Sequence, residues 1–262
     1  MNNKTKLWLA VLLAATMVAA MAACSSKKTE LTVSAAASLT EALKEIQENY
    51  EKERGSVKLL FNFGASGALQ QQIEQGAQAD LFLSAAVKNM KALMDKNLIH
   101  ETGPADLLQN ELVVVVPNGG GTAVAALGDL AKPELKKIAI GIPESVPAGS
   151  YAQEALNAAK QWEPLQPKLV QGKDVKQVLQ YVETGNADAG FVYKTDALTS
   201  DKVRIAFAVD PALYSPIVYP LGVVKETKHL KEAQRFFQYL MTPEAMAVFE
   251  KYGFSKGYSS SE

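Results

Sequence analysis

The sequence predicts an α/β protein of two lobes, each a central, mostly parallel sheet flanked by helices. Short β-rich runs alternate with amphipathic helical patterns along most of the chain, as in the strand–helix–strand units of parallel sheets. The pattern breaks after ELVVVVPN at 111–118 and then starts again, which indicates a second lobe. A chain of 262 residues is long enough to bury two such cores.

The first 23 residues have the features of an export signal. Two lysines precede an apolar stretch that is short for a membrane span, and small residues end it just before Cys24, the single cysteine. This ending resembles a bacterial lipobox, so we expect a lipoprotein signal peptide at 1–23 and acylation of Cys24. The alternative is a plain secretory signal. Residues 24–30 are expected to be a polar tether that holds the folded domain at the membrane surface.

The first lobe is expected to begin at Leu31. Its predicted elements are strands at 31–36, 57–63 and 79–85 and helices at 39–53 and 68–76. In the helix at 39–53, apolar residues recur at helical spacing and are expected to face the core: Leu39, Ala42, Leu43 and Ile46. The closing segment at 232–254 reads as two helices divided at Pro243.

The second lobe is expected at 111–216, inserted into a first lobe that comprises 31–110 and 217–262. Beyond the run at 111–118, β-rich runs occur at 136–143, 187–197 and 203–209, and helical patterns at 150–162 and 174–185. Two extended crossings, near 109–117 and 214–222, are expected to form a two-strand hinge between the lobes.

The composition disfavours several kinds of chemistry. The 27 basic and 28 acidic residues nearly cancel, so the charge does not indicate a nucleic-acid partner. The only histidines, His100 and His229, are far apart, and Cys24 is assigned to the anchor, so we expect neither a His/Cys metal site nor a cysteine nucleophile. No G-x-S-x-G elbow, P-loop or G-x-G-x-x-G follows a predicted strand. We therefore expect no enzyme activity and no cofactor.

Four turns that lead from β-rich runs into helices are rich in small, neutral residues. These turns are SAAAS at 34–38, GASG at 64–67, SVPAGS at 145–150 and GKDV at 172–175. In open α/β sheets the ligand crevice lies beyond the carboxyl ends of the strands, where such turns gather. Helix N-termini there present unpaired N–H groups and a positive potential, which together favour an anion.

Helix capping is the alternative explanation for three of these residues. Ser38, Ser150 and Asp174 each fit a capping box with Glu41, Gln153 and Gln177 three positions later. Capping alone would account for them without any ligand. At Ser38 the two interpretations conflict, because a closed box would use the N–H that an anion needs.

Five blocks of sequence carry a resemblance to a known family. They are AAASLTEAL at 35–43, GASGALQQQIEQGAQADLFLSA at 64–85, IGIPESVPAGSYAQEAL at 140–156, GKDVKQVLQYVETGNADAGFVYKTDA at 172–197 and FEKYGF at 249–254. Together they resemble the molybdate-binding proteins of ABC importers, within the wider family of two-lobed periplasmic-type solute receptors. The resemblance spans nearly all of the chain from Leu31 to Phe254 and implies a periplasmic-binding-protein-like fold.

The resemblance also implies a binding site for a tetrahedral oxyanion held between the lobes by uncharged donors. The implied residues are Ser38 and Ser66, each through its hydroxyl and N–H, Ala148 and Val175 through their N–H groups, and Tyr193 through its phenolic O–H. No direct cation site is implied. Ala68 and Gln78 depart from the residues common in relatives, but neither is one of these five. Asp174 would repel a dianion, so we expect its side chain to cap the helix instead.

The function implied is that of a receptor rather than an enzyme. It would capture molybdate, and also tungstate, and deliver it to an ABC permease with its ATPase. We expect an extracytoplasmic monomer anchored to the cell membrane through Cys24, with no nucleic-acid partner. The alternatives are a receptor for another tetrahedral oxyanion such as sulfate, and an anion sensor that takes no part in transport.

Overall fold

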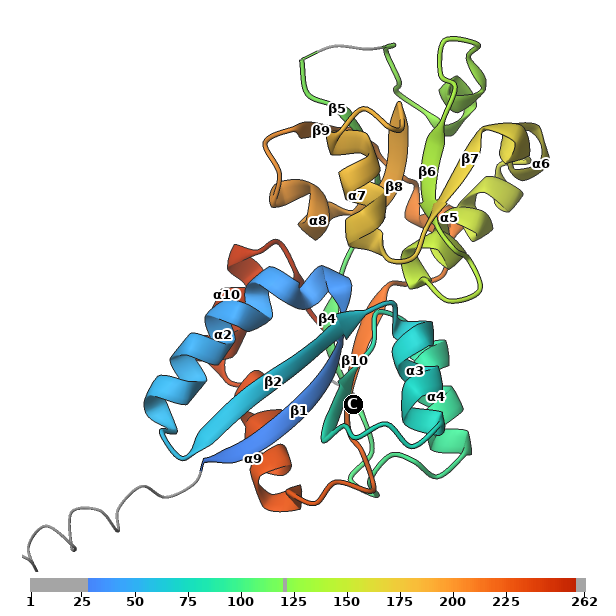
Figure 1. Cartoon of the computed structure of the whole chain (residues 1–262). Coiled ribbons are helices and arrows are strands. Elements are labelled where there is room, and N and C mark those ends of the chain that lie inside the picture. Colours follow the sequence, from blue (N-terminus) through green and yellow to red (C-terminus); the bar gives the residue numbers. More distant parts are fainter. Residues whose placement is uncertain (1–27, 120–121, 258–262) are drawn as a thin grey trace, which may run out of the picture.

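Two β-sheets with helices on their faces divide the molecule into two lobes (Figure 1). The computed structural model describes residues 28–119 and 122–257. Lobe I is named here for the six-stranded sheet and its helices, and lobe II for the five-stranded sheet and its helices. The predicted signal peptide at 1–23 and Cys24 lie outside the described residues.

Lobe I is assembled from both ends of the described chain. Its elements are β1 (Thr29–Ala36), η1 (Ala37–Leu39), α2 (Thr40–Glu53), β2 (Val57–Gly64), α3 (Ser66–Glu74), β3 (Leu81–Leu83), α4 (Val87–Asp95), β4 (Ala105–Gln109), β10 (Val218–Val223), α9 (Leu230–Leu240), α10 (Pro243–Lys251) and β11 (Ser255–Lys256). The strand order is β11-β4-β10-β3-β1-β2, so the late strand β10 lies inside the sheet.

Lobe II is continuous in sequence. Its elements are β5 (Leu112–Pro117), η2 (Leu127–Ala131), β6 (Ile138–Gly141), α5 (Pro147–Ala158), α6 (Trp162–Leu165), η3 (Gln166–Lys168), β7 (Leu169–Gly172), α7 (Val175–Glu183), β8 (Ala189–Tyr193), α8 (Lys194–Leu198), β9 (Val203–Ala208) and η4 (Pro211–Leu213). The strand order is β7-β6-β8-β5-β9.

Strand direction follows a single rule in both sheets. In lobe I, β1 pairs in parallel with β2 and β3, whereas β10 is antiparallel to β3 and β4. In lobe II, β6 pairs in parallel with β7 and β8, whereas β5 is antiparallel to β8 and β9. The reversed strands β5 and β10 are those by which the chain enters each lobe from the other; the two-residue strand β11, antiparallel to β4, is also reversed. A strand that begins at the cleft runs away from it. The strands antiparallel to β5 and β10, and the strands parallel to those, therefore run toward the cleft and end there.

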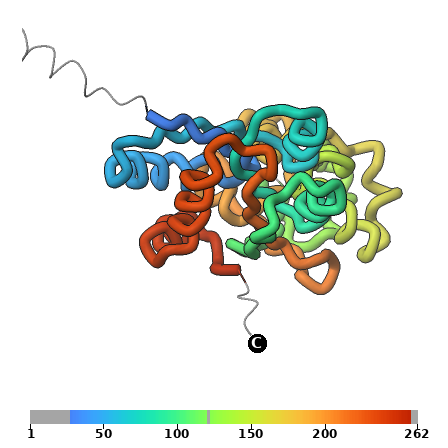
Figure 2. The backbone as a smooth tube through the Cα atoms, turned by 90° about the horizontal axis from the view of Figure 1, so that it is seen from below, coloured from blue at the N-terminus to red at the C-terminus, as the bar shows by residue number. Residues whose placement is uncertain are grey.

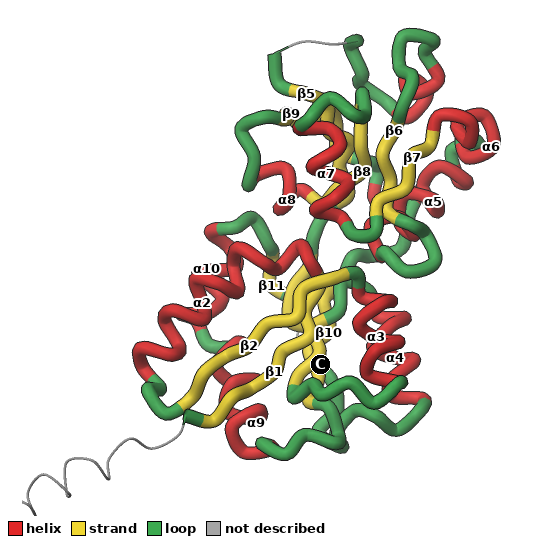
Figure 3. Tube along the Cα trace, viewed as in Figure 1, coloured by secondary structure: helices red, strands yellow, loops and turns green. Residues whose placement is uncertain are grey.

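Helices cover both faces of the lobe I sheet (Figure 3). Helices α2, α9 and α10 lie on one face, and α3 and α4 lie on the other. Seen from below, the C-terminal helices lie beside α2 (Figure 2). Tyr50 of α2 packs on Phe236 of α9, with ring centroids 4.8 Å apart. The four apolar residues expected on the buried face at 39–53 are all buried, which confirms that prediction.

The predicted α/β fold with two lobes is confirmed, with local differences. The expected division at 110/111 falls between β4 and β5, and that at 216/217 between β9 and β10; the division at single-residue precision stays a prediction. Strand β1 begins two residues before Leu31, because Thr29 and Glu30 already pair with β2, so the tether ends earlier than expected. Three short strands were not predicted: β4, β7 and β11.

Candidate functional site

The carboxyl ends of strands from both lobes meet around a small pocket. The pocket is narrow and partly open to solvent, and the centre of a water-sized molecule can occupy only about 10 Å³ of it. Its lining residues are small or neutral apart from a single aspartate: Ala36, Ala37, Ser38, Gly64, Ala65, Ser66, Ala85, Val146, Pro147, Ala148, Asp174, Val175 and Tyr193. All five residues expected from the family resemblance line this pocket: Ser38, Ser66, Ala148, Val175 and Tyr193.

Three α-helices begin at the pocket. Ser66 is the first residue of α3, Val175 is the first of α7, and Ala148 is the second of α5, after Pro147. The first N–H groups of an α-helix have no partner within the helix, and the helix dipole places positive potential there. Proline at the start of α5 suits this position, since its missing N–H would be unpaired anyway. The pocket therefore joins three positive helix ends, two from lobe II and one from lobe I.

The Ser66 hydroxyl is held as a donor. Its Oγ accepts a hydrogen bond from the backbone N–H of Ala85 at 2.9 Å, and an amide N–H can only donate. The hydroxyl hydrogen of Ser66 is therefore free for another acceptor. Ser66 is fully buried, so its hydrogen can meet a ligand only inside the pocket.

Tyr193 supplies a second hydroxyl. It ends β8 and its side chain is buried. Within the described part of the chain its phenolic oxygen has no partner of hydrogen-bond geometry. Burial, and to a smaller extent the neighbouring Tyr219 phenol, raises the pKa of Tyr193 well above 10, so the phenol keeps its proton. A buried hydroxyl without a partner is costly, and one that borders a pocket is explained by a ligand that accepts its hydrogen bond.

Ser38 lines the pocket from η1. Its Oγ is 2.9 Å from the phenolic oxygen of Tyr219 in β10, and its side chain is almost fully buried. The capping interpretation of Ser38 is wrong: α2 begins only at Thr40, whose hydroxyl donates to the Ala37 carbonyl oxygen in the intervening 3-10 turn. Tyr219 was not expected from the sequence.

Asp174 caps its helix, as expected. Its Oδ1 accepts the backbone N–H of Gln177 at 2.8 Å, which occupies one oxygen of the single carboxylate in the pocket lining. Among the described residues, no Lys, Arg or His lines the pocket. Ser150, by contrast, is no cap, because α5 begins three residues earlier at Pro147; its Oγ accepts from Lys88 Nζ at 2.8 Å. The pocket is thus formed by uncharged donors and carries no compensating cation.

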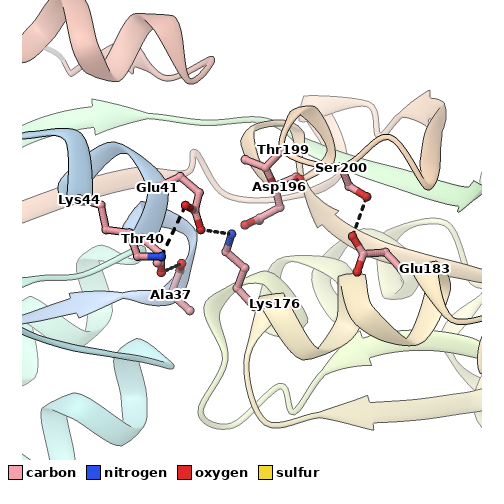
Figure 4. A network of polar contacts seen from close by, with 9 residues as sticks. All are labelled: Ala37, Thr40, Glu41, Lys44, Lys176, Glu183, Asp196, Thr199 and Ser200. Carbon is pink, nitrogen blue, oxygen red and sulfur yellow. Dashed lines mark hydrogen bonds and ion pairs between the residues drawn. The ribbon is translucent and has the colours of Figure 1, made fainter.

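Several contacts join the lobes around the pocket. The Gly67 N–H donates to the Ser145 carbonyl oxygen at 2.9 Å, and the Lys88–Ser150 bond also crosses between the lobes. On another side, Lys176 Nζ of α7 lies 3.4 Å from a carboxylate oxygen of Glu41 in α2 (Figure 4). Glu41 therefore pairs across the cleft and does not close a capping box with Ser38.

Asp196 lies next to this ion pair, in α8 (Figure 4). Its Oδ2 accepts the Tyr193 N–H at 3.2 Å, and within the described residues its Oδ1 has no partner. Burial raises the pKa of Asp196 to about 7, against the opposing effects of the Lys176 charge and the Tyr193 hydrogen bond. Nothing in the sequence pattern pointed to this carboxyl group.

Among residues 28–119 and 122–257, no three His, Cys, Asp or Glu side chains come together as a metal-binding group. In the same part of the chain no helix is both long and apolar enough to cross a membrane.

Two lobes joined by two crossings, with donors from both lobes around one pocket, define a solute-binding protein. The family model for bacterial extracellular solute-binding proteins matches residues 31–255, and the chain belongs to this family. The family resemblance read from the sequence blocks is confirmed.

Relatives and a solved structure agree with this assignment. YvgL of Bacillus subtilis, provisionally named an ABC transporter substrate-binding lipoprotein, is 55% identical over 231 residues, with 88% of each chain covered. The molybdate-binding protein ModA of Escherichia coli is 38% identical over 230 residues, covering 86% of this chain and 89% of its own. The substrate-binding domain of a provisionally named molybdenum ABC transporter from Clostridium difficile is 44% identical, with a TM-score of 0.68, covering 88% of this chain and all of its own.

Proposed function

We propose that the protein captures molybdate in the pocket between its lobes through Ser38, Ser66, Ala148, Val175 and Tyr193. A single observation carries the proposal: the buried hydroxyls of Ser66 and Tyr193 border the pocket with hydrogens that no described protein group accepts. Three helix N-termini add N–H donors, and no cation contributes. The similarity to molybdate-binding proteins supports the choice of anion.

The chemistry of the anion fits this arrangement. Molybdate is a tetrahedral dianion without a hydrogen at neutral pH, so each of its oxygens accepts hydrogen bonds only. Hydrogen bonds to charged groups contribute about 1.5–3 kcal/mol each, although such contributions do not add. A phosphate that keeps an O–H would need an acceptor, and Asp174, one of whose oxygens accepts the Gln177 N–H, is the single carboxylate that the described lining offers. Tungstate, with the same shape and charge, is expected to bind as well.

Delivery and location are part of the same proposal. The loaded protein would hand the anion to an ABC permease with its ATPase, which is supported by the similarity to an ABC substrate-binding lipoprotein. It would act outside the cytoplasm as a monomer, anchored to the cell membrane by a lipid on Cys24. The protein itself would catalyse no reaction. Donors from both lobes give the closed arrangement the higher anion affinity, and this difference drives closure.

Calorimetry tests the proposal directly. The full-length protein in mild detergent is titrated with molybdate, tungstate, sulfate and phosphate at neutral pH. We expect tight binding of molybdate and tungstate and far weaker binding of the other two. Failure to bind molybdate, or equally tight binding of sulfate or phosphate, would show that the pocket serves another solute.

A further inference from the structure

Behind Ser38 lies a chain of two polar side chains that do not line the pocket, the buried Tyr219 and the partly buried Asn110. Asn110 Nδ2 is 3.1 Å from the phenolic oxygen of Tyr219, and that oxygen is 2.9 Å from Ser38 Oγ. We propose that Asn110 and Tyr219 are positioning residues that fix the Ser38 hydroxyl as a hydrogen-bond donor toward the bound anion. The inference rests on the proposed function, because it assigns a direction to one contact of that site.

The donor-to-acceptor direction of these hydrogen bonds is set at Asn110, between β4 and β5. Its Oδ1 accepts the backbone N–H of Glu111 at 2.9 Å, which fixes the side-chain amide, because only an oxygen can accept there. Nδ2 therefore faces the other two partners and donates to both, to Thr195 Oγ1 at 2.8 Å and to the Tyr219 oxygen. Since the amide nitrogen has no acceptor capacity, Tyr219 cannot donate to it.

Tyr219 in turn sets the direction of the hydrogen bond at Ser38. It is 1% exposed, and burial together with the Asp196 charge raises the pKa of its phenol well above 10, so the group stays protonated. Its oxygen already receives a hydrogen from Asn110. The 2.9 Å contact with Ser38 Oγ allows either hydroxyl to donate, and we take Tyr219 as the donor because a phenol is the stronger hydrogen-bond donor of the two. Ser38 Oγ then accepts a hydrogen bond from Tyr219. Its own hydroxyl hydrogen is left to donate to a ligand in the pocket that Ser38 lines.

The Ser38 hydroxyl is then oriented in the same way as that of Ser66, whose oxygen accepts the Ala85 N–H. In both serines a donor from the protein occupies the oxygen and leaves the hydrogen to the ligand. With Tyr193, the three hydroxyls of the pocket can then all present hydrogens to the ligand. A serine hydrogen fixed toward the ligand favours an anion oxygen that only accepts over a protonated one, so these two positioning residues act on selectivity.

A double-mutant cycle tests the inference. Tyr219→Phe keeps the ring that packs edge-on against Tyr193 and Phe254 and removes only the hydroxyl. It is combined with Ser38→Ala in the full-length protein, and calorimetry measures the affinities for molybdate and for phosphate. We expect Tyr219→Phe to weaken molybdate binding by about 3- to 10-fold, to reduce the molybdate-to-phosphate affinity ratio, and to have almost no effect once Ser38→Ala is present.

The controls separate this role from a structural one. Tyr214→Phe removes a different phenol, one that accepts from the Leu112 N–H and does not touch Ser38, and it should leave both affinities unchanged. If Tyr219→Phe does not fold, Asn110→Leu replaces it in the cycle, and its effect should be larger with Ser38 intact than with Ser38→Ala. An equal loss in both backgrounds, or an unchanged selectivity ratio, would overturn the inference.

The wild-type titration keeps the two proposals apart. If the wild-type protein binds molybdate but the cycle shows no coupling, the proposed function stands and this inference is wrong. If it binds sulfate in place of molybdate, the cycle is run with sulfate, and coupling there supports the positioning role alone. If it binds none of the four anions, both are wrong.

Discussion

The backbone N–H of Gly67 donates to the carbonyl oxygen of Ser145 at 2.9 Å, so the main chain of lobe I touches the main chain of lobe II. A Cβ atom at Gly67 would lie 2.7 Å from that oxygen and 2.8 Å from the Ser145 Cα. Only glycine permits this approach, beside the two serines that line the pocket. The glycine at this turn therefore serves the contact between the lobes.

Gly67→Ala should hinder closure. The added methyl group cannot enter the space next to Ser145, so the closed arrangement loses population and anion affinity falls by about 10- to 100-fold. Calorimetry gives the affinity, and small-angle X-ray scattering shows whether the anion still makes the protein more compact. Gly55→Ala is the matched control, because a Cβ atom there meets nothing within 4 Å. Normal affinity and compaction in Gly67→Ala would contradict the steric argument.

Tyr193→Phe should separate binding from stability. The hydroxyl has no described protein partner, so its removal breaks no bond in the ligand-free protein. The free energy of unfolding should stay the same or rise, since an unsatisfied buried group is lost. Molybdate affinity should fall by about 10- to 150-fold, corresponding to a hydrogen bond to a charged group. Urea unfolding and calorimetry provide the two values, and a destabilised variant of normal affinity would place the hydroxyl outside the site.

Ser66→Ala should lower both the free energy of unfolding and the affinity for the anion. The Ser66 oxygen accepts the buried Ala85 N–H, and without it that N–H is unpaired, at a cost of about 1–3 kcal/mol in the free energy of unfolding. Anion affinity should fall as well. Ser66→Cys serves as the comparison variant, because it keeps a weak acceptor near Ala85. Unfolding of the ligand-free proteins measures the first effect, and an unchanged midpoint for Ser66→Ala would show that the Ala85 contact contributes no stability.

Asp196 should make stability fall as pH rises from about 4 to about 7. An aspartate in the unfolded chain has a pKa of about 3.9, whereas burial raises that of Asp196 to about 7 in the folded protein. Between these values the folded state binds the extra proton, so the free energy of unfolding decreases by about 1.4 kcal/mol per pH unit and then levels off. Asp196→Asn should remove this slope, as measured by urea unfolding at several pH values without ligand. Identical pH profiles would show that the carboxyl titrates normally.

Much of the fold follows from local sequence pattern. The apolar spacing of α2 and the β-rich run of β5 set those elements without tertiary information, and Asp174 caps α7 as a short-range signal should. The gathering of five residues around the pocket follows from the strand-end rule and the family resemblance together. Their binding roles stay a prediction.

The missed features depend on distant partners or on weak signals. Ser38 contacts Tyr219 across 181 positions of sequence, so no local pattern could distinguish that contact from a cap. Ser150 is different, because Pro147 at the start of α5 is a usable signal that the helix begins earlier. Strand β7, an edge strand of four residues, is too short to show a period.

The place of β10 between β3 and β4 determines the order in which the protein can be completed. This interior strand is synthesised after all of lobe II, so until then β3 lacks a neighbour and the lobe I sheet is in two pieces. Proteolysis of a released fragment that ends at residue 216 should find lobe II protected and 28–110 cleaved. Lobe I thus stays incompletely folded during most of translation. A chain that has not completed its fold can still pass through a narrow channel.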